Sequence, residues 1–292
     1  MKQVVFISGK GGTGKSTVVA ALSRMAGDKV LADCDVDAPN LHLLVRGTRT
    51  YQADFSGANA ALIDREKCVE CGACRDACRF DAIQEDYGVE PMACEGCGAC
   101  MLVCPTDAIR LTQVKTGETY VDDTSLGTFS HARLDIGAEG SGKLVTAVKK
   151  NMQRYQKDEI WALVDGSPGI GCVVIASMTG ADAVVAVCEP TQSGKSDLVR
   201  VLQVAAHFGI PAYVCINKYD LHEGLTGEIE GLCRENNIPV IGRIPYEPAV
   251  IQALQAMQTP VEAGLTHITD EIGRMWDTLT AALNEEKENK ED

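Results

Sequence analysis

Residues 9–16 read Gly9-Lys10-Gly11-Gly12-Thr13-Gly14-Lys15-Ser16, which fits the pattern G-x-x-x-x-G-K-[ST]. An apolar run at residues 4–7 precedes this stretch, and a helical pattern at residues 16–25 follows it. A phosphate-binding loop needs this order of strand, loop and helix, because its glycines let backbone N–H groups surround phosphates at a helix N-terminus. The pattern therefore predicts that Lys15 reaches the β- and γ-phosphates and that the Ser16 hydroxyl binds Mg²⁺. The nucleotide contacts expected here are Gly9, Gly11, Gly12, Thr13, Gly14, Lys15, Ser16 and Thr17.

Outside this loop the chain alternates between apolar runs of strand length and helical patterns. This alternation predicts an α/β fold with a mostly parallel sheet and helices on both faces. Residues 117–135 look like further short strands, but the pattern does not place them in the sheet. The expected strands after the first are residues 29–32, 160–164, 183–187, 212–216 and 240–244.

Two copies of a four-cysteine run interrupt the alternation. Both runs have the spacing C-x2-C-x2-C-x3-C, and the second repeats the first after a shift of 26 residues, from Cys68 to Cys94. We interpret residues 62–113 as a duplicated module inserted in a loop after the second strand, because an insertion at an exposed loop leaves the host sheet intact. Residues 1–61 and 114–292 then form the host domain.

The spacing of the two runs is typical of paired [4Fe-4S] clusters, in which the fourth cysteine of each run binds the other cluster. Two tetrahedral zinc sites are the alternative, but zinc does not account for the third cysteine at the same interval or for Pro105 after the second run. Arg79 follows the first run, where a bacterial ferredoxin usually has proline. The predicted ligands are Cys68, Cys71, Cys74 and Cys104 for cluster one, and Cys94, Cys97, Cys100 and Cys78 for cluster two.

Composition and charge exclude several classes of protein. The 13 cysteines of this 292-residue chain favour metal ligation over a disulfide framework, which is a feature of small secreted proteins. A net charge of −14 argues against nucleic-acid binding, which needs clustered Lys and Arg. No apolar run is long enough to cross a bilayer, so we expect a cytoplasmic protein without membrane insertion. The five cysteines outside the module lie in apolar segments, and most are expected in the core.

Lys10 is not needed by an ordinary phosphate loop, and here the chain resembles the deviant-Walker-A ATPases. This group includes MinD, ParA, the Mrp/Nbp35-type cluster carriers and the nitrogenase iron protein. In these proteins the equivalent lysine reaches across a homodimer to the nucleotide of the other subunit. The resemblance therefore implies a homodimer in which nucleotide binding and dimer closure are linked.

Further motifs of this group can be placed on the sequence one at a time. Residues 31–37 resemble its first switch, which implies that Asp35 positions the attacking water and that Asp33 lies near Mg²⁺. Residues 160–169 resemble the Walker B strand and second switch, with Asp165 holding Mg²⁺ through water. The catalytic residues implied are Lys10, Lys15, Asp35 and Asp165. The base would meet Asn217 and Lys218, with Pro245 and Glu247 completing that pocket.

The nearest resemblance is to MinD/Mrp-like ATPases with an inserted ferredoxin domain. It implies a slow or partner-stimulated ATPase whose nucleotide state is coupled to electron transfer through two [4Fe-4S] clusters to a partner. A metallocofactor assembly or carrier ATPase is the first alternative, and a MinD-like spatial regulator is the second. Cys172 follows Asp165 at the interval of a cluster ligand in the nitrogenase iron protein, but Glu139 occupies the position of the companion cysteine.

A second stretch of the sequence resembles the phosphate loop. Residues 137–143 also fit G-x4-G-K, but Leu144 follows the lysine and has no hydroxyl for Mg²⁺. We therefore do not expect a second nucleotide site at Lys143.

Overall fold

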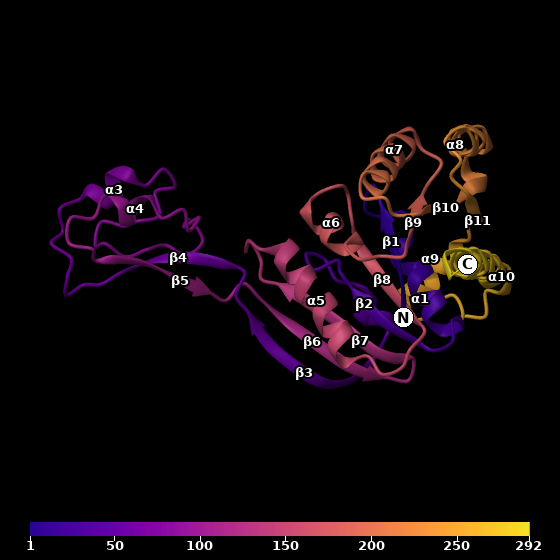
Figure 1. Ribbon diagram of the computed structural model, residues 1–292, viewed down its shortest axis with the longest axis horizontal. Coiled ribbons are helices and arrows are strands. Elements are labelled where there is room, and N and C mark those ends of the chain that lie inside the picture. Colours follow the sequence, from indigo (N-terminus) through magenta and orange to yellow (C-terminus); the bar gives the residue numbers. More distant parts are fainter. Residues whose placement is uncertain (292) are drawn as a thin grey trace.

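The structure, a computed structural model, describes residues 1–291, with side chains up to residue 285. Its body is a nine-stranded sheet in the order β11-β10-β9-β1-β8-β2-β7-β6-β3, with helices on both faces (Figure 1). The first six strands of this order are all parallel, which confirms the expected mostly parallel α/β sheet. They are β1 (Lys2–Ser8), β2 (Lys29–Asp33), β8 (Trp161–Pro168), β9 (Ala183–Cys188), β10 (Ala212–Asn217) and β11 (Val240–Ile244).

Three more strands extend the sheet beyond β2. Strand β7 (Gly127–Leu134) is parallel to β2, β6 (Gly117–Thr124) is antiparallel to β7, and β3 (Gly47–Phe55) is antiparallel to β6. The short strands expected in residues 117–135 are therefore a hairpin at one side of the sheet. Sequence alone did not place them because hairpin pairing does not specify which neighbouring strand the hairpin joins.

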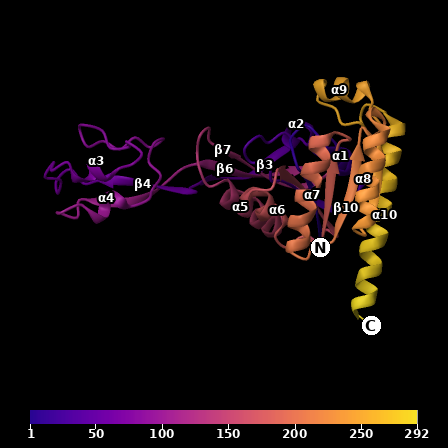
Figure 2. The same cartoon turned by 90° about the horizontal axis from the view of Figure 1, so that it is seen from above.

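The cysteine region stands away from the body at the end of a two-stranded arm (Figures 1 and 2). The arm consists of β4 (Ala58–Ile63) and β5 (Ile109–Val114), which pair antiparallel in a sheet of their own. Since β4 follows β3 and β5 precedes β6, the arm continues the antiparallel ribbon at the edge of the main sheet. The predicted domain limits at residues 62 and 113 fall within β4 and β5, and they stay a prediction.

The two cysteine runs have repeated backbone conformations as well as repeated spacing. Helix α3 (Ala73–Ala77) starts after Gly72 with φ +82°, and α4 (Ala99–Leu102) starts after Gly98 with φ +76°. Asp81 and its counterpart in the second half, Asp107, both have φ +50°, a value uncommon outside glycine. The 26-residue repeat is therefore a repeat of structure.

The body has two cores because successive residues of a strand face opposite sides of the sheet. In β1, Val5 and Ile7 join the core on one face, and Val4 and Phe6 join the core on the other. The first face is covered by α5 (Ser141–Tyr155), α6 (Cys172–Met178), α7 (Gln192–His207) and α8 (Glu223–Glu235), and the second by α1 (Lys15–Met25), α2 (Leu41–Leu44), α9 (Pro248–Gln255) and α10 (Thr266–Glu291). A short 3₁₀ turn, Tyr219–Leu221, follows β10.

The C-terminal helix packs on the body through its apolar stripe, which includes Ile272, Trp276 and Leu279, all in the second core. The apolar stripe of α10 is therefore part of the core. In the part of the chain that is described, no helix combines the length and apolar character needed to cross a bilayer.

Candidate functional site: the nucleotide cavity and the two cysteine sets

The predicted phosphate loop connects the end of β1 to the start of α1. Gly12 and Gly14 have φ of +83° and +87°, a region that residues with a Cβ rarely adopt. Helix α1 begins at Lys15 with no side-chain cap on its first turn, which leaves its N–H groups for a bound anion. The Thr13 hydroxyl is buried and has no hydrogen-bond partner among the described residues. The loop therefore presents unpaired donors at a helix N-terminus and suits a phosphate group.

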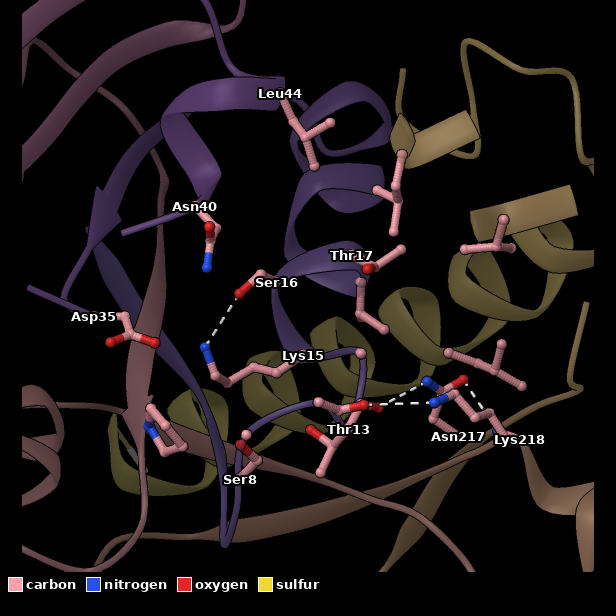
Figure 3. A pocket seen from close by; sticks show the side chains of 18 of the residues that line it. Ser8, Thr13, Lys15, Ser16, Thr17, Asp35, Asn40, Leu44, Asn217 and Lys218 are labelled. Atoms are coloured by element: carbon pink, nitrogen blue, oxygen red, sulfur yellow. Dashed lines mark hydrogen bonds between the residues drawn. The ribbon is translucent and has the colours of Figure 1, made fainter. Parts of the chain in front are cut away.

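A cavity of about 750 Å³ opens beside this loop (Figure 3). Its walls come from the loop, the first switch region, the ends of β8, β10 and β11, and helices α9 and α10. A volume of this order is typical of sites for ligands of nucleotide size. Of the predicted contacts, Gly11, Gly12, Thr13, Gly14, Lys15, Ser16, Thr17, Asp35, Asn217, Lys218, Pro245 and Glu247 line it.

Lys15 is buried and forms an ion pair with Asp165, which is also buried. Burial alone would lower the pKa of Lys15, but the carboxylates of Asp165, Asp33 and Asp35 together more than offset this and raise it. Burial, followed by the nearby charge of Asp165, raises the pKa of Asp33 to about 8. Burial also raises the pKa of Asp35. Asp33, Asp35 and Asp165 thus place three carboxyl groups around a single lysine, and a bound divalent cation would favour their ionised forms.

Asp33 is the last residue of β2, and Asp35 follows two residues later. Their side chains nevertheless have different surroundings. The Asp33 carboxylate accepts the backbone N–H of Asp35 at 3.0 Å and that of Leu41 at 3.1 Å, so it shapes the first switch. The Asp35 side chain lines the cavity on the same side as Lys15 (Figure 3). Of the two carboxylates, Asp35 is the one that the cavity makes available to a ligand.

Lys10, the second lysine of the loop, points away from Lys15 to the start of α7. Its Nζ lies 3.2 Å from Thr191 Oγ1, 3.1 Å from Ser193 Oγ and 3.7 Å from a Glu189 carboxylate oxygen. Glu189 also forms an ion pair with Lys218. Sequence reasoning did not select Glu189, although it follows β9 directly and the carboxyl ends of parallel strands are where ligand sites form.

Asn217 holds the phosphate loop in place. Its side-chain Nδ2 donates to the Thr13 carbonyl at 2.7 Å, and its Oδ1 accepts the Lys218 N–H at 3.1 Å (Figure 3). A Cβ on Gly14 would collide with the Asn217 amide. Both ends of the amide are thus engaged within the chain, and the pairing of Asn217 with an adenine edge stays a prediction.

The eight cysteines of the module gather in two sets at the end of the arm. One small cavity is lined by Cys68, Cys71, Cys74 and Cys104, and a second by Cys78, Cys94, Cys97 and Cys100. Each set takes three thiols from one run and the fourth from the other. These are the two ligand sets expected from sequence, and cluster ligation by them stays a prediction.

Backbone amides donate to two of these sulfurs. Ala108 N–H lies 3.3 Å from Cys104 Sγ, and Ala61 N–H lies 3.4 Å from Cys94 Sγ. Hydrogen bonds from the backbone amides of Thr106 and Ala108 lower the pKa of Cys104, which favours the thiolate. Within the described residues, no group of three or more His, Cys, Asp or Glu side chains could hold a single metal ion. Each set of thiols lines a small space, and sulfur is the donor type that an iron–sulfur cluster would need there.

Four of the five cysteines outside the module are in the core, as expected, but Cys172 is not. Cys34, Cys188, Cys215 and Cys233 are buried, whereas Cys172 is exposed at the start of α6. Glu139 lies beside Glu95 of the module and raises the pKa of that carboxyl by hydrogen bonding and charge. Glu139 is therefore at the contact between body and module.

The match to a known family model covers residues 4–261, nearly the whole body and the cysteine region within it. That model is described as the CobQ/CobB/MinD/ParA nucleotide binding domain. The chain belongs to this family. It is therefore an ATP-binding protein of the MinD/ParA type, in agreement with the loop and cavity described above.

The chain is also similar in sequence to a curated protein and in fold to solved structures. The chain is 34% identical over 222 residues to Uncharacterized protein MJ0578 of Methanocaldococcus jannaschii, covering 74% of this chain and 78% of that protein. Its fold is similar to that of MinD from Pyrococcus horikoshii complexed with Mg-ADP, with a TM-score of 0.57 and 16% identity over 95% of each chain. The McdA(D38A)-ATP complex from Cyanothece gives a TM-score of 0.58 with 15% identity over 96% of each chain.

A second group of side chains that the sequence did not reveal lies where β3, β6 and β7 meet α2. His131 Nε2 lies 2.9 Å from the Asp122 carboxylate, which also forms an ion pair with Arg49. The His42 ring stacks near His131, with 5.9 Å between ring centroids. These side chains come from α2, β3, β6 and β7, so only the strand pairing reveals that they meet.

Proposed function

We propose that this protein is a homodimeric MgATP-hydrolysing iron–sulfur protein in which nucleotide state controls electron delivery from residues 62–113 to a partner protein. The observation that carries the proposal is the gathering of eight cysteines into two four-thiol sets on an arm that continues from segments of the nucleotide site. Towards the N-terminus, β3 and α2 connect the arm to the first switch. Towards the C-terminus, β6, β7 and α5 connect it to β8, which carries Asp165.

Residues 62–113 form a ferredoxin-type module in this proposal. Cys68, Cys71, Cys74 and Cys104 hold one [4Fe-4S] cluster, and Cys78, Cys94, Cys97 and Cys100 hold the other. When bound, such clusters accept and donate single electrons. All four thiols of each set are used as ligands, which favours electron transfer over the binding of a substrate to iron.

In the nucleotide site, Lys15 leaves Asp165 to contact the β- and γ-phosphates, and Ser16 and Asp165 hold Mg²⁺. Asp33 stays behind them and fixes the first switch through its two backbone hydrogen bonds. Asp35 positions the attacking water. Pro245 and Glu247 enclose the base. Hydrolysis is slow without a partner.

The homodimer rests on Lys10. This lysine is held by its own chain at Glu189, Thr191 and Ser193, and its amine is partly exposed, with about a third of the side chain accessible to solvent (31%). Lys10 leaves these contacts when two subunits close around MgATP and then reaches the nucleotide of the other subunit. Binding that differs between the open and closed states is sufficient for nucleotide control. We place the protein in the cytoplasm, where reducing conditions keep the eight thiols of the module available as ligands.

The test is an anaerobic redox titration of the purified protein, followed by EPR, with bound iron counted and with or without MgATP. About eight irons per chain and a change in potential or line shape with MgATP would support the proposal. The Lys15→Met variant is the matched control, because it should retain its iron and lose the response to MgATP.

Other outcomes point to other functions. Iron released on adding MgATP would support a cluster carrier or assembly ATPase. Purified protein that binds zinc in place of iron, or spectra that MgATP leaves unchanged, would overturn nucleotide-controlled electron transfer. A MinD-like spatial regulator with structural clusters would then be the function that best fits the family.

A further inference from the structure

The arm joins the body at a narrow junction, which we call the arm hinge and define as residues 56–57 and 115–116. These residues separate β3 from β4 and β5 from β6. Gly57 is buried, and its N–H donates to Thr116 Oγ1 at 2.9 Å. Thr116 N–H in turn donates to the Phe55 carbonyl at 2.8 Å. The arm hinge is thus a small hydrogen-bonded unit on which the whole cysteine module is carried.

The look-alike loop at residues 137–143 packs directly on this hinge. Lys143 Nζ donates to the Gly57 carbonyl at 3.0 Å. A Cβ on Gly140 would lie 2.9 Å from Gly57 Cα, and Gly140 has φ +98°, so glycine is needed there for both contact and conformation. Lys143, which has the position of a phosphate-binding lysine, therefore binds a peptide carbonyl of the arm hinge.

The same loop contacts the module and the second switch on its other sides. A Cβ on Gly137 would lie 2.7 Å from Met92 Cε, two residues before Cys94. A Cβ on Gly142 would lie 3.5 Å from the Cβ of Cys172, which begins α6 directly after the 165–171 segment. Lys149, further along α5, donates to the Ser177 carbonyl of α6 at 2.6 Å, so the two helices are tied together. One continuous set of contacts runs from the second switch through the start of α5 to the arm hinge.

We propose that residues 137–143 relay movement of the second switch to the arm hinge and so reorient the module, with Lys143 as the positioning residue. The relay depends on the proposed function in one respect only, which is that the module carries iron–sulfur clusters. Its physical basis is a two-sided contact: α5 is a rigid helix whose first turn touches α6 on one side and Gly57 on the other. A shift of the 165–171 segment on MgATP binding moves Cys172, and α5 carries that shift to the Gly57 carbonyl.

The test is hydrogen exchange of the full-length holoprotein under anaerobic conditions, with and without saturating MgATP. In the wild type we expect amides of residues 56–59 and 115–117 to change their exchange rates by about tenfold on MgATP binding, the size expected when one charged hydrogen bond is altered. In Lys143→Met this response should fall to less than about twofold, while the response of residues 9–16 and the iron content stay the same. Lys143→Arg should keep most of the response, because arginine also donates to a carbonyl.

Lys150→Met is the matched control, because Lys150 is an exposed lysine on the same helix. It should respond as the wild type does. A full hinge response in Lys143→Met, or no hinge response in a wild type whose residues 9–16 do respond, would overturn the relay. The exchange measurement does not depend on electron transfer, so a hinge that responds beside unchanged EPR spectra would reject the proposed function and leave the relay standing.

Discussion

In the body, residues 4–7 of β1 are completely buried, and a large apolar core lies on each face of the sheet. In the module, five buried residues form a core together with Ala61 of the arm, and two of the five are Cys74 and Cys100. Apolar side chains are also left outside, such as Leu102, which is 90% exposed. The body contains enough apolar burial to fold by itself, whereas the module resembles small domains that depend on bound metal for their stability.

The difference extends to the polar groups of the two regions. The body uses charge at its centre, where Lys15 and Asp165 are both buried and paired. In the module the buried and half-buried polar groups include thiols, and two of these thiols accept hydrogen bonds from backbone N–H groups. Both tryptophans, Trp161 and Trp276, lie in the body and contact each other edge to face, so tryptophan fluorescence reports on the body alone. Visible absorption and EPR would report on the module, which allows the two regions to be followed separately.

The largest effect should follow removal of iron. Anaerobic chelation should lower the amide protection of residues 62–113 by at least about a hundredfold, because ligation and folding are coupled in a domain with so small a core. The melting temperature of the body, followed by tryptophan fluorescence, should change by less than about 2 °C. Hydrogen exchange and thermal melts of the same sample measure both.

Cys172→Ser is the control for this prediction, since that thiol lies outside the module. The variant should keep its iron and its protection. A module that stayed protected after iron removal would show that its few buried apolar residues suffice, and the contrast between the regions would disappear.

Lys15→Met should destabilise the body by about 3 kcal/mol in the absence of nucleotide, because it leaves the buried Asp165 carboxylate without its partner. Lys10→Met, in the same loop, should cost less than about 1 kcal/mol, since Lys10 and its partners are partly exposed. Urea unfolding followed by tryptophan fluorescence gives both values. Iron content should be the same in both variants, and equal losses for the two lysines would contradict the role given to the buried pair.

Lys149 should make the stability of the body depend on pH. Burial lowers the pKa of Lys149 to about 8 in the folded protein, whereas an unfolded lysine titrates near 10.4. Between these values the unfolded state binds more protons, so the Lys149 contribution to stability rises with pH. Wild type should therefore gain about 2 kcal/mol relative to Lys149→Met between pH 8 and pH 10.

Urea unfolding at the two pH values measures this gain. The buried Cys34 thiol, whose pKa burial raises to about 12, acts in the opposite direction. The charge of Lys149 lowers the pKa of Cys34, so the difference between wild type and Lys149→Met includes this coupling. Lys150→Met, on the same helix, should show the pH dependence of the wild type. A constant difference between wild type and Lys149→Met would mean that this ammonium keeps an ordinary pKa.

The smallest effect should come from Arg79, the residue that departs from the usual ferredoxin pattern. Arg79→Met should lower one of the two cluster potentials by about 20 mV, the size expected for one solvent-screened charge near the cluster. The ATPase rate and the stability of the body should not change. Redox titration measures the shift, and Arg200→Met on α7 provides an exposed arginine in the body as control. If both cluster potentials of Arg79→Met equalled those of the wild type, the charge of Arg79 would have no part in setting them, and the backbone N–H groups would be the remaining cause.

The sequence by itself determined the features that depend on local pattern. Residues 9–16 predicted the phosphate loop, the apolar runs predicted the six parallel strands, and the family model confirms the nucleotide-binding assignment. Spacing also identified which cysteines would share a set, because a C-x2-C-x2-C-x3-C run folds into a short helix that leaves its fourth thiol beside the other run. These patterns are readable because each arises from residues close together in the chain.

Only the tertiary structure decided what depends on pairing between distant segments. The register of β3, β6 and β7 brings His131, Asp122 and Arg49 together, and no local pattern records that register. Glu189 meets Lys10 and Lys218 because β9 and β10 are neighbours in the sheet. Lys143 faces Gly57 across 86 residues of sequence. A hydrogen bond of that kind depends on where two elements pack, and packing is a property of the whole fold.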